Sequence, residues 1–197
     1  MYLFGASGHG KVIVEIAEEL NENIDGFLDA DVTKTNVFTY PVFHQVPKDT
    51  IDVIFSLGNN EIRKKLSDQF LNFHYKTLIH PNASISKRAT IGEGTVVMAG
   101  VSINSEAQIG KHCIINTNAS IDHECIIHDF VHISPNAALA GNVEVGEGTH
   151  VGIGTTVIQG IKIGKWCTIG AGAVIIKDVP DYAVVVGNPG KIIKYNK

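Results

Sequence analysis

The chain has 197 residues and a formal net charge of −4, with 16 lysine and arginine residues against 20 aspartate and glutamate residues. This acidic balance argues against nucleic acid as a partner, and no stretch approaches the ~20 consecutive apolar residues of a membrane span. Met1 leads directly into Tyr2, Leu3 and Phe4 with no signal-peptide pattern, so we expect a cytoplasmic protein of one large or two small domains.

The first 80 residues have the pattern of a small α/β domain. We expect strands over 2–4, 26–29 and 52–57, helices over 11–20 and 61–71, and turns at 5–10 and 58–60. Strands that alternate with helices favour a parallel, Rossmann-like sheet. We assign residues 1–80 to this domain.

The turn at 5–10 reads Gly-Ala-Ser-Gly-His-Gly and directly precedes the first predicted helix. Backbone N–H groups at a helix N-terminus can bind phosphate, and Asp29 follows Gly10 by 19 residues, near the spacing of ribose-binding acids in dinucleotide folds. The motif is not the G-x-G-x-x-G of dinucleotide enzymes, and the domain is short, so a single nucleotide is favoured over NAD. The alternative is a tight turn whose glycines serve geometry alone, with His9 either touching ligand or packing.

A strict six-residue aliphatic period fills the C-terminal half of the chain. It fits neither a helix nor a flat strand, and it is typical of a solenoid with one inward-pointing residue on each side of a coil. Small or β-branched residues recur four positions later, and they include all three cysteines, which we interpret as packing residues. The aliphatic positions are Ile85, Ile91, Val97, Ile103, Ile109, Ile115, Ile121, Ile127, Ile133, Leu139, Val145, Val151, Val157, Ile163, Ile169 and Ile175.

The pattern resembles the hexapeptide repeat of left-handed parallel β-helices, in which three hexads make one coil of 18 residues. We assign 81–180 to this domain and take its handedness from the resemblance. Between 116 and 142 the glycines after the aliphatic positions disappear and histidines gather, which predicts a functional site; the alternative is a solvated polar face.

The 18-residue coil predicts which residues stack. Gly141 is expected over His123, and His150 over His132, while His123 and His132 differ by half a coil and lie on opposite sides. One site that uses both must therefore form between subunits. His123 suits a general base, and Glu124 could raise its basicity if the pair sits at a corner. Five other histidines are read as surface or packing residues: His44, His74, His80, His112 and His128.

Four segments together resemble one family: 5–10, the Gly-Asn-Asn-Glu-Ile-Arg-Lys of 58–64, the stretch 116–125 that contains His123-Glu124, and Ala-Gly-Asn-Val at 140–143. They resemble the bacterial UDP-4-amino-sugar N-acetyltransferases of the bacillosamine pathway, to which sialic-acid O-acetyltransferases and perosamine N-acetyltransferases are related. The resemblance covers essentially the whole chain. It implies a homotrimer that binds a UDP-amino-sugar in the N-terminal domain and acetyl-CoA between neighbouring solenoids, without a metal.

The resemblance also implies roles for individual residues. His123 would be the catalytic base and Glu124 its partner, and the tail 181–197 would close over CoA. Ala30 and Ala171 depart from the family, which has an acid and a glycine there. Substrate would be bound by Ser7, Gly8, His9, Asp29, Gly58 and Asn116, and the cofactor by His132, Gly141, Ile153 and Ala171.

Other functions stay open at this point. An O-acetyltransferase acting on sialic acid would share the fold and base, and the nucleotide could be GDP or dTDP in place of UDP. A metal enzyme resembling β-helix carbonic anhydrases would use His123 and His128, but Lys87 stands where its third histidine is expected. A purely structural solenoid is opposed by the glycine-rich turn and the polar break.

Overall fold

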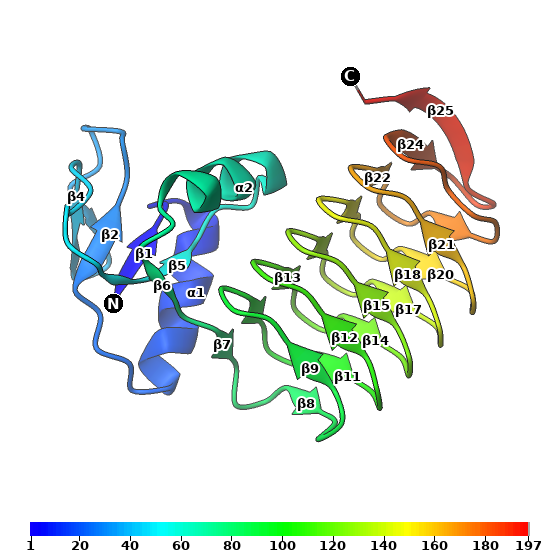
Figure 1. Ribbon diagram of the computed structural model, residues 1–197, viewed down its shortest axis with the longest axis horizontal. Coiled ribbons are helices and arrows are strands. Elements are labelled where there is room, and N and C mark those ends of the chain that lie inside the picture. The colour runs from blue at the N-terminus through cyan, green and yellow to red at the C-terminus, as the bar shows by residue number, and fades with distance from the viewer. Residues whose placement is uncertain (197) are drawn as a thin grey trace.

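The computed structural model describes residues 1–196 as an α/β domain followed by a parallel β-helix (Figure 1). The predicted fold, including the left-handed hexapeptide β-helix, is confirmed. The β-helix rises in stacked coils away from the N-terminal domain, and the C-terminal strand lies at its far end. Of the predicted tail 181–197, Lys197 lies outside the described residues.

The N-terminal sheet has the strand order β3-β4-β2-β1-β5-β6. It is parallel as predicted, except that β3 and β4 form an antiparallel hairpin at one edge. Only two residues join these strands, and Phe38 among them adopts a left-handed φ of +50°, which a two-residue hairpin turn requires. The strands are β1 (Tyr2–Phe4), β2 (Gly26–Leu28), β3 (Asn36–Val37), β4 (Tyr40–Phe43), β5 (Asp52–Phe55) and β6 (His74–Tyr75).

Two helices belong to this domain, α1 (Gly8–Glu19) and α2 (Asn60–Gln69). Helix α1 begins three residues earlier than predicted, because the glycine-rich turn supplies its first turn. A side chain at Gly10 would lie 2.6 Å from the carbonyl oxygen of Gly5 and 3.0 Å from the ring of Phe27. This glycine therefore permits close packing of the helix on the strands.

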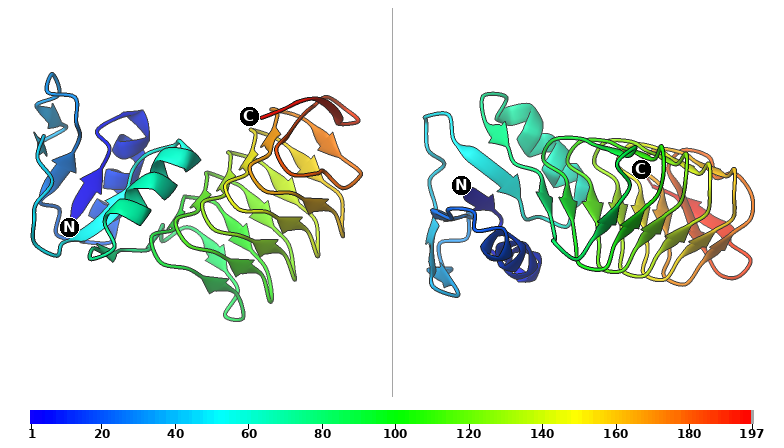
Figure 2. Two further views of the ribbon diagram at one scale, coloured as in Figure 1. Left: turned by 45° about the horizontal axis from the view of Figure 1, so that its top comes forward. Right: turned by 90° about the horizontal axis from the view of Figure 1, so that it is seen from below.

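Three parallel sheets form the faces of the β-helix (Figure 2). Partners are 18 residues apart, as in Val96 with Ile114 and His132 with His150. The first face contains β7 (Leu78–Ile79), β10 (Val96–Val97), β13 (Ile114–Ile115), β16 (His132–Ile133), β19 (His150–Val151) and β22 (Thr168–Ile169), continued by β24 (Ala183–Val186) and the antiparallel β25 (Lys191–Tyr195).

The other two faces are shorter. The second face contains β8 (Ser84–Ile85), β11 (Ser102–Ile103), β14 (Ser120–Ile121), β17 (Ala138–Leu139), β20 (Thr156–Val157) and β23 (Val174–Ile175). The third face contains β9 (Thr90–Ile91), β12 (Gln108–Ile109), β15 (Ile126–Ile127), β18 (Glu144–Val145) and β21 (Lys162–Ile163).

The interior confirms the periodicity. Fourteen of the sixteen predicted aliphatic residues are buried in one core cluster. The other two, Ile85 and Ile91, are partly buried and pack against it. The three cysteines are free and buried in the same cluster. Glycines after the aliphatic positions are required where coils touch, since a side chain at Gly92 would lie 2.6 Å from the carbonyl carbon of Gly110. The residue three positions after the aliphatic one adopts a left-handed φ at most corners, as at Glu106, His112 and Glu124.

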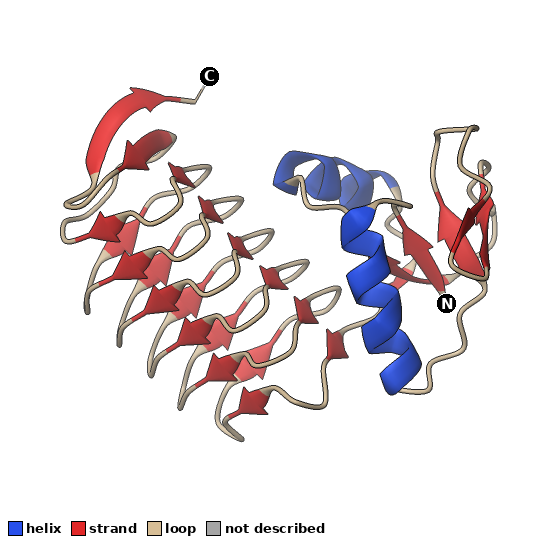
Figure 3. Ribbon diagram, turned by 180° about the vertical axis from the view of Figure 1, so that it is seen from behind, coloured by secondary structure: helices blue, strands red, loops and turns tan. Residues whose placement is uncertain are grey.

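Helix α1 joins the two domains. Figure 3 shows it between the small sheet and the β-helix. Its buried face, with Ile13 and Ile16, shares a cluster with Leu78, Val96 and Ile114 on the outer surface of the first face. The outward row of that face is therefore apolar where the helix covers it.

Helix α2 adds a polar joint. The guanidinium of Arg63 is 1% exposed and donates to three backbone oxygens, those of His112 (3.1 Å), Leu57 (3.1 Å) and Phe130 (2.9 Å). Asn60 donates to the carbonyl of Gly148 at 2.9 Å. These bonds tie the N-terminal domain to three successive corners of the β-helix.

We predict that Arg63→Met lowers the free energy of unfolding by about 3 kcal/mol, because three buried carbonyls lose their donor. Urea denaturation measures the change. The exposed Lys65 lies on the same helix, and Lys65→Ala should change stability by less than about 0.5 kcal/mol. Equal effects of both substitutions would contradict the structural role of Arg63.

Candidate active site

The outward-facing side chains of the first face change from apolar residues to histidines at the level where α1 begins. Ile114 is followed one coil higher by His132 and then by His150, whose rings stack with centroids 4.6 Å apart at 16°. His9, in the first turn of α1, approaches from the other domain, with its ring centroid 6.3 Å from that of His132. The predicted stacking of His150 over His132 is confirmed.

Hydrogen bonds fix the tautomer of His132. The Oδ1 atom of Asn116 accepts from the Thr117 N–H at 2.8 Å, so its Nδ2 donates to His132 Nε2 at 3.1 Å. His132 therefore carries its proton on Nδ1. Within residues 1–196, His132 Nδ1 and His9 Nε2 are buried atoms without a hydrogen-bond partner. Both atoms lie in the buried contact between the two domains.

A groove of about 550 Å³ opens along this row. It brings together four predicted site residues, Asn116, His132, Ile153 and Ala171. Sequence reasoning left out His150, although it placed that residue over His132. It also missed Ser134 and Pro135, whose only signal was their position directly after His132. Ser134 Oγ and His150 Nε2 are hydrogen-bonded at 2.8 Å.

The His123-Glu124 pair forms at a corner, as its predicted role requires. Glu124 has a left-handed φ of +59°, which turns its side chain toward its neighbour, and Glu124 Oε2 lies 3.0 Å from His123 Nδ1. A carboxylate only accepts, so Nδ1 carries the proton and Nε2 is free to act as a base.

Gly141 lies directly above this imidazole. A side chain at Gly141 would lie 2.4 Å from His123 Cε1 and 2.5 Å from Nε2, so only glycine leaves room for the ring. The neighbouring Asn142 N–H donates to the carbonyl of His123 at 2.9 Å. Within residues 1–196 the Gly141 N–H makes no hydrogen bond. The basic nitrogen and the residue with the free N–H are therefore stacked on adjacent coils.

These two groups of residues lie apart on one chain. His123 and Gly141 follow strands β14 and β17 of the second face, at the corner that leads to the third face. The groove begins at the first face, with His132 and His150, and reaches Ile153 and Ala171 at the corner before the second face. The base and the groove thus flank the second face from its two sides.

The predicted nucleotide residues gather at one edge of the N-terminal sheet. Ser7, Gly8 and His9 follow β1, Asp29 follows β2 and Gly58 follows β5. The ends of parallel strands meet at such an edge, where ligands of α/β domains bind. Ser7 and Gly8 are exposed, and Gly58 lines a small polar cavity beside His150.

The carboxylate of Asp29 is already engaged. It accepts from the Ala6 N–H (2.8 Å), the Asp31 N–H (2.9 Å) and Lys34 Nζ (2.8 Å). Partial burial raises the pKa of Asp29, but the bond to Lys34 and the two amide donors outweigh it and lower the pKa. Asp29 shapes the glycine-rich turn, a contribution that spacing alone did not reveal.

Comparison with known proteins identifies the family. Residues 1–70 match the PglD N-terminal domain, and residues 142–177 match the bacterial transferase hexapeptide family (six repeats). The acetyltransferase domain of PglB from Neisseria gonorrhoeae is 39% identical, with a TM-score of 0.92 over 98% of each chain. The chain belongs to the PglD-type hexapeptide acetyltransferases.

Other members of this family have been solved with ligands. PerB from Caulobacter crescentus, in complex with CoA and GDP-perosamine, is 36% identical, with a TM-score of 0.91 over 98% of this chain and 96% of that one. The PglB domain has also been solved with acetyl coenzyme A. The UDP-N-acetylbacillosamine N-acetyltransferase of Bacillus subtilis (strain 168) is 42% identical over 108 residues, 49% of this chain. The chain spans about half the length of that curated relative (50%).

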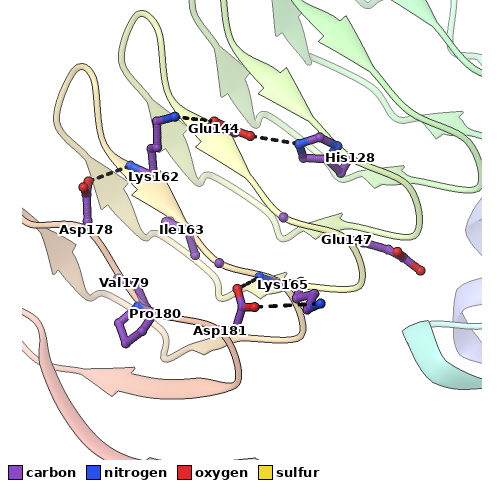
Figure 4. A pocket seen from close by; sticks show the side chains of 12 residues that line it. His128, Glu144, Glu147, Lys162, Ile163, Lys165, Asp178, Val179, Pro180 and Asp181 are labelled. Atoms are coloured by element: carbon purple, nitrogen blue, oxygen red, sulfur yellow. Dashed lines mark hydrogen bonds and ion pairs between the residues drawn. The ribbon is translucent and has the colours of Figure 1, made fainter.

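A cavity of about 590 Å³ lies elsewhere on this acetyltransferase-family chain, on the third face (Figure 4). There Glu144 pairs with His128 (3.1 Å) and Lys162 (3.1 Å). None of the predicted catalytic, substrate or cofactor residues lines it, and His128 is a surface residue as predicted. We therefore place the candidate site at the groove and the His123 corner.

Two further findings concern metals and membranes. Across residues 1–196, no three His, Cys, Asp or Glu side chains are grouped closely enough to hold a metal ion. No helix in this part of the chain is both long and apolar enough to cross a bilayer.

Burial keeps several histidines neutral. It lowers the pKa of His132 to about 2, with help from His150, and the pKa of His9 to about 4. His112, stacked on Phe130, also has its pKa lowered to about 4 by burial. Each would titrate at 6.5 in the unfolded chain.

We predict that stability falls as the pH drops from 6.5 toward 4. In this pH window His9, His112 and His132 bind protons in the unfolded chain but stay neutral in the folded protein. Each therefore lowers the free energy of unfolding by up to about 1.4 kcal/mol per pH unit. Urea denaturation between pH 7 and pH 5 measures the slope. His112→Phe removes one titrating group and should flatten the slope; an unchanged slope would show that His112 titrates normally.

Proposed function

We propose that the protein is an acetyl-CoA-dependent N-acetyltransferase that acetylates the 4-amino group of a UDP-4-amino-4,6-dideoxy-N-acetyl-hexosamine. Relatives over the whole chain bind CoA or acetyl-CoA, and one of them binds a nucleotide amino sugar. The observation that carries the proposal is the His123 corner, where Gly141, whose N–H is free, lies directly above the imidazole. Acetyl transfer to an amine needs such a base and such a donor.

His123 would serve the transfer twice. Its Nε2 accepts a proton from the sugar amine as the amine nitrogen bonds to the acetyl carbon, and Glu124 stabilises the resulting imidazolium. The same proton then goes to the departing sulfur as the carbon–sulfur bond breaks, which restores the base. The Gly141 N–H stabilises the negative oxygen of the tetrahedral intermediate, typically the largest contribution in acyl transfer.

A homotrimer would complete the site. Because the groove and the His123 corner flank the second face from two sides, neighbouring chains can bring one chain's His123 to the groove of the next. His132, Ile153 and Ala171 would then bind acetyl-CoA together with Gly141 of the adjacent chain, and Asn116 would lie near the amine. Strands β24 and β25 continue the sheet that contains the groove, which supports a tail that covers CoA.

The α/β domain of residues 1–80 would hold the nucleotide sugar at Ser7, Gly8, His9, Asp29 and Gly58. In the groove, His9 approaches His132, so a nucleotide bound at the glycine-rich turn can extend its sugar toward the acetyl group. Nucleotide sugars and acetyl-CoA are cytoplasmic metabolites, which supports a cytoplasmic enzyme.

We test the substrate with acetyl-CoA and a panel of UDP-, GDP- and dTDP-linked amino sugars, with free sialic acid as the O-acetyl acceptor. Thiol release from CoA should be fastest with a UDP-4-amino sugar. A preference for a GDP-linked sugar would correct the nucleotide, and activity on sialic acid alone would replace the proposal by O-acetyl transfer.

We predict that His123→Asn lowers kcat by about 100- to 10,000-fold, because the base is removed while the corner is kept. The same thiol-release assay measures this loss. His128→Asn, at an exposed histidine on the third face, is the matched control and should keep full activity. Retained activity of His123→Asn would reassign the base.

We predict that Gly141→Ala lowers kcat by about 100-fold or more, because its methyl group would overlap the imidazole of His123. Circular dichroism and thermal unfolding should show an intact fold. Gly154→Ala is a useful comparison, since a side chain there meets open space but takes a left-handed φ of +64°. Gly154→Ala should lower the free energy of unfolding without a comparable loss of kcat.

A further inference from the structure

Asp122 holds the backbone of the corner from which His123 acts. Its Oδ1 atom accepts from the His123 N–H at 2.8 Å and from Asn104 Nδ2 at 2.7 Å. Asn104 stands one coil below Asp122, 18 residues earlier. Neither residue was among the site residues predicted from the sequence.

The imidazole needs this support because its own partner binds weakly. The side chains of His123 and Glu124 are 57% and 60% exposed, and exposed pairs of this kind contribute little to fixing a geometry. The position of the ring therefore depends on the backbone of the corner.

That backbone is fixed at three points. Glu124 N–H donates to the carbonyl of Ser105 at 3.0 Å, and the carbonyl of His123 accepts from Asn142 at 2.9 Å. Equivalent backbone bonds recur at other corners, as from Asn118 to Ala99. The bond from His123 N–H to Asp122 is the one of the three that depends on a side chain.

Two neighbouring corners show what this side chain does. Asn116 accepts from the next residue's N–H in the same way, at 2.8 Å, and its other end holds the ring of His132. One coil above Asp122 stands Ala140, which cannot accept, and there the N–H of Gly141 is free. Asp122 thus fixes the amide of His123, while the amide one coil above has no such acceptor.

Asp122 also brings a charge. The hydrogen bond from Asn104, followed by that from the His123 N–H, lowers the pKa of its carboxyl. Asp122 is therefore ionised at neutral pH, and with Glu124 it puts two carboxylates beside one imidazole. A nearby negative charge favours the protonated form of a histidine.

We propose that Asp122, held by Asn104, is a positioning residue for His123 that fixes the corner of the base and keeps a negative charge beside it. This inference rests on the proposed function of His123 as the base. It assigns Asp122 no contact with either substrate.

The test separates the hydrogen bond from the charge. Asp122→Ala removes both and should lower kcat about 10- to 100-fold with little change in either KM. Asp122→Asn keeps the acceptor and removes the charge, so it should retain most of kcat. Asn104→Ala should lower kcat less than Asp122→Ala does.

Asp129→Ala is the matched control. Asp129 accepts from the Lys111 N–H at 2.8 Å, also a bond from a backbone amide to an aspartate, at a corner that follows the third face. This variant should keep kcat. Its own loss of stability shows how much of the Asp122→Ala effect is structural.

Hydrogen exchange of the His123 amide, measured by NMR without substrates, keeps the inference separate from the proposed function. The amide should exchange faster in Asp122→Ala than in the native chain, whether or not the panel yields a substrate, while Asp122→Asn should keep most of its protection. Native kcat and unchanged exchange of this amide in Asp122→Ala would overturn the inference. An inactive native chain with faster exchange in Asp122→Ala would overturn only the proposed function.

Discussion

Residues 18 positions apart lie one above the other in this protein, because three sides of six residues close each coil. This register depends on an unbroken series of inward aliphatic side chains whose shared burial drives the folding of the β-helix. It stacks His150 on His132, sets Gly141 over His123, and puts Asn104 under Asp122. The contacts between coils at the candidate site are therefore set by this register.

The second domain uses the same register. Helix α1 covers the outward row of the first face only as far as Ile114, and His9 at its start meets the histidines above. The packing of α1 thereby brings the glycine-rich turn to the groove, and the bonds of Arg63 and Asn60 hold the two domains together. The turn and the groove are neighbours because α1 begins at the level where the outward residues change from apolar to polar.

Much of this was predictable from the sequence. Six-residue periodicity and simple counting gave the interior cysteines, the stacked histidines and the glycine over the base, since the coil admits one register. The corner that joins His123 to Glu124 was predicted as a requirement, and the left-handed φ of Glu124 supplies it.

Other features depend on contacts that periodicity does not encode. Arg63 was part of an ordinary helical pattern, and a charged helix residue is normally exposed; its burial follows from two carbonyls of the β-helix and the carbonyl of Leu57 in its own domain. The spacing of Asp29 predicted a ribose contact, but its carboxylate accepts from the glycine-rich turn. The register puts Asn104 under Asp122, but it does not show that Asp122 accepts from the His123 N–H.

The buried joint at Arg63 has a consequence for the conditions under which the two sites stay in place. Its acceptors are neutral carbonyls, so there is no opposing carboxylate for dissolved salt to screen or for acid to neutralise. Burial lowers the pKa of the guanidinium only to about 10, well above neutrality. The contact that holds the glycine-rich turn close to the groove is therefore left unchanged by ionic strength and by ordinary pH.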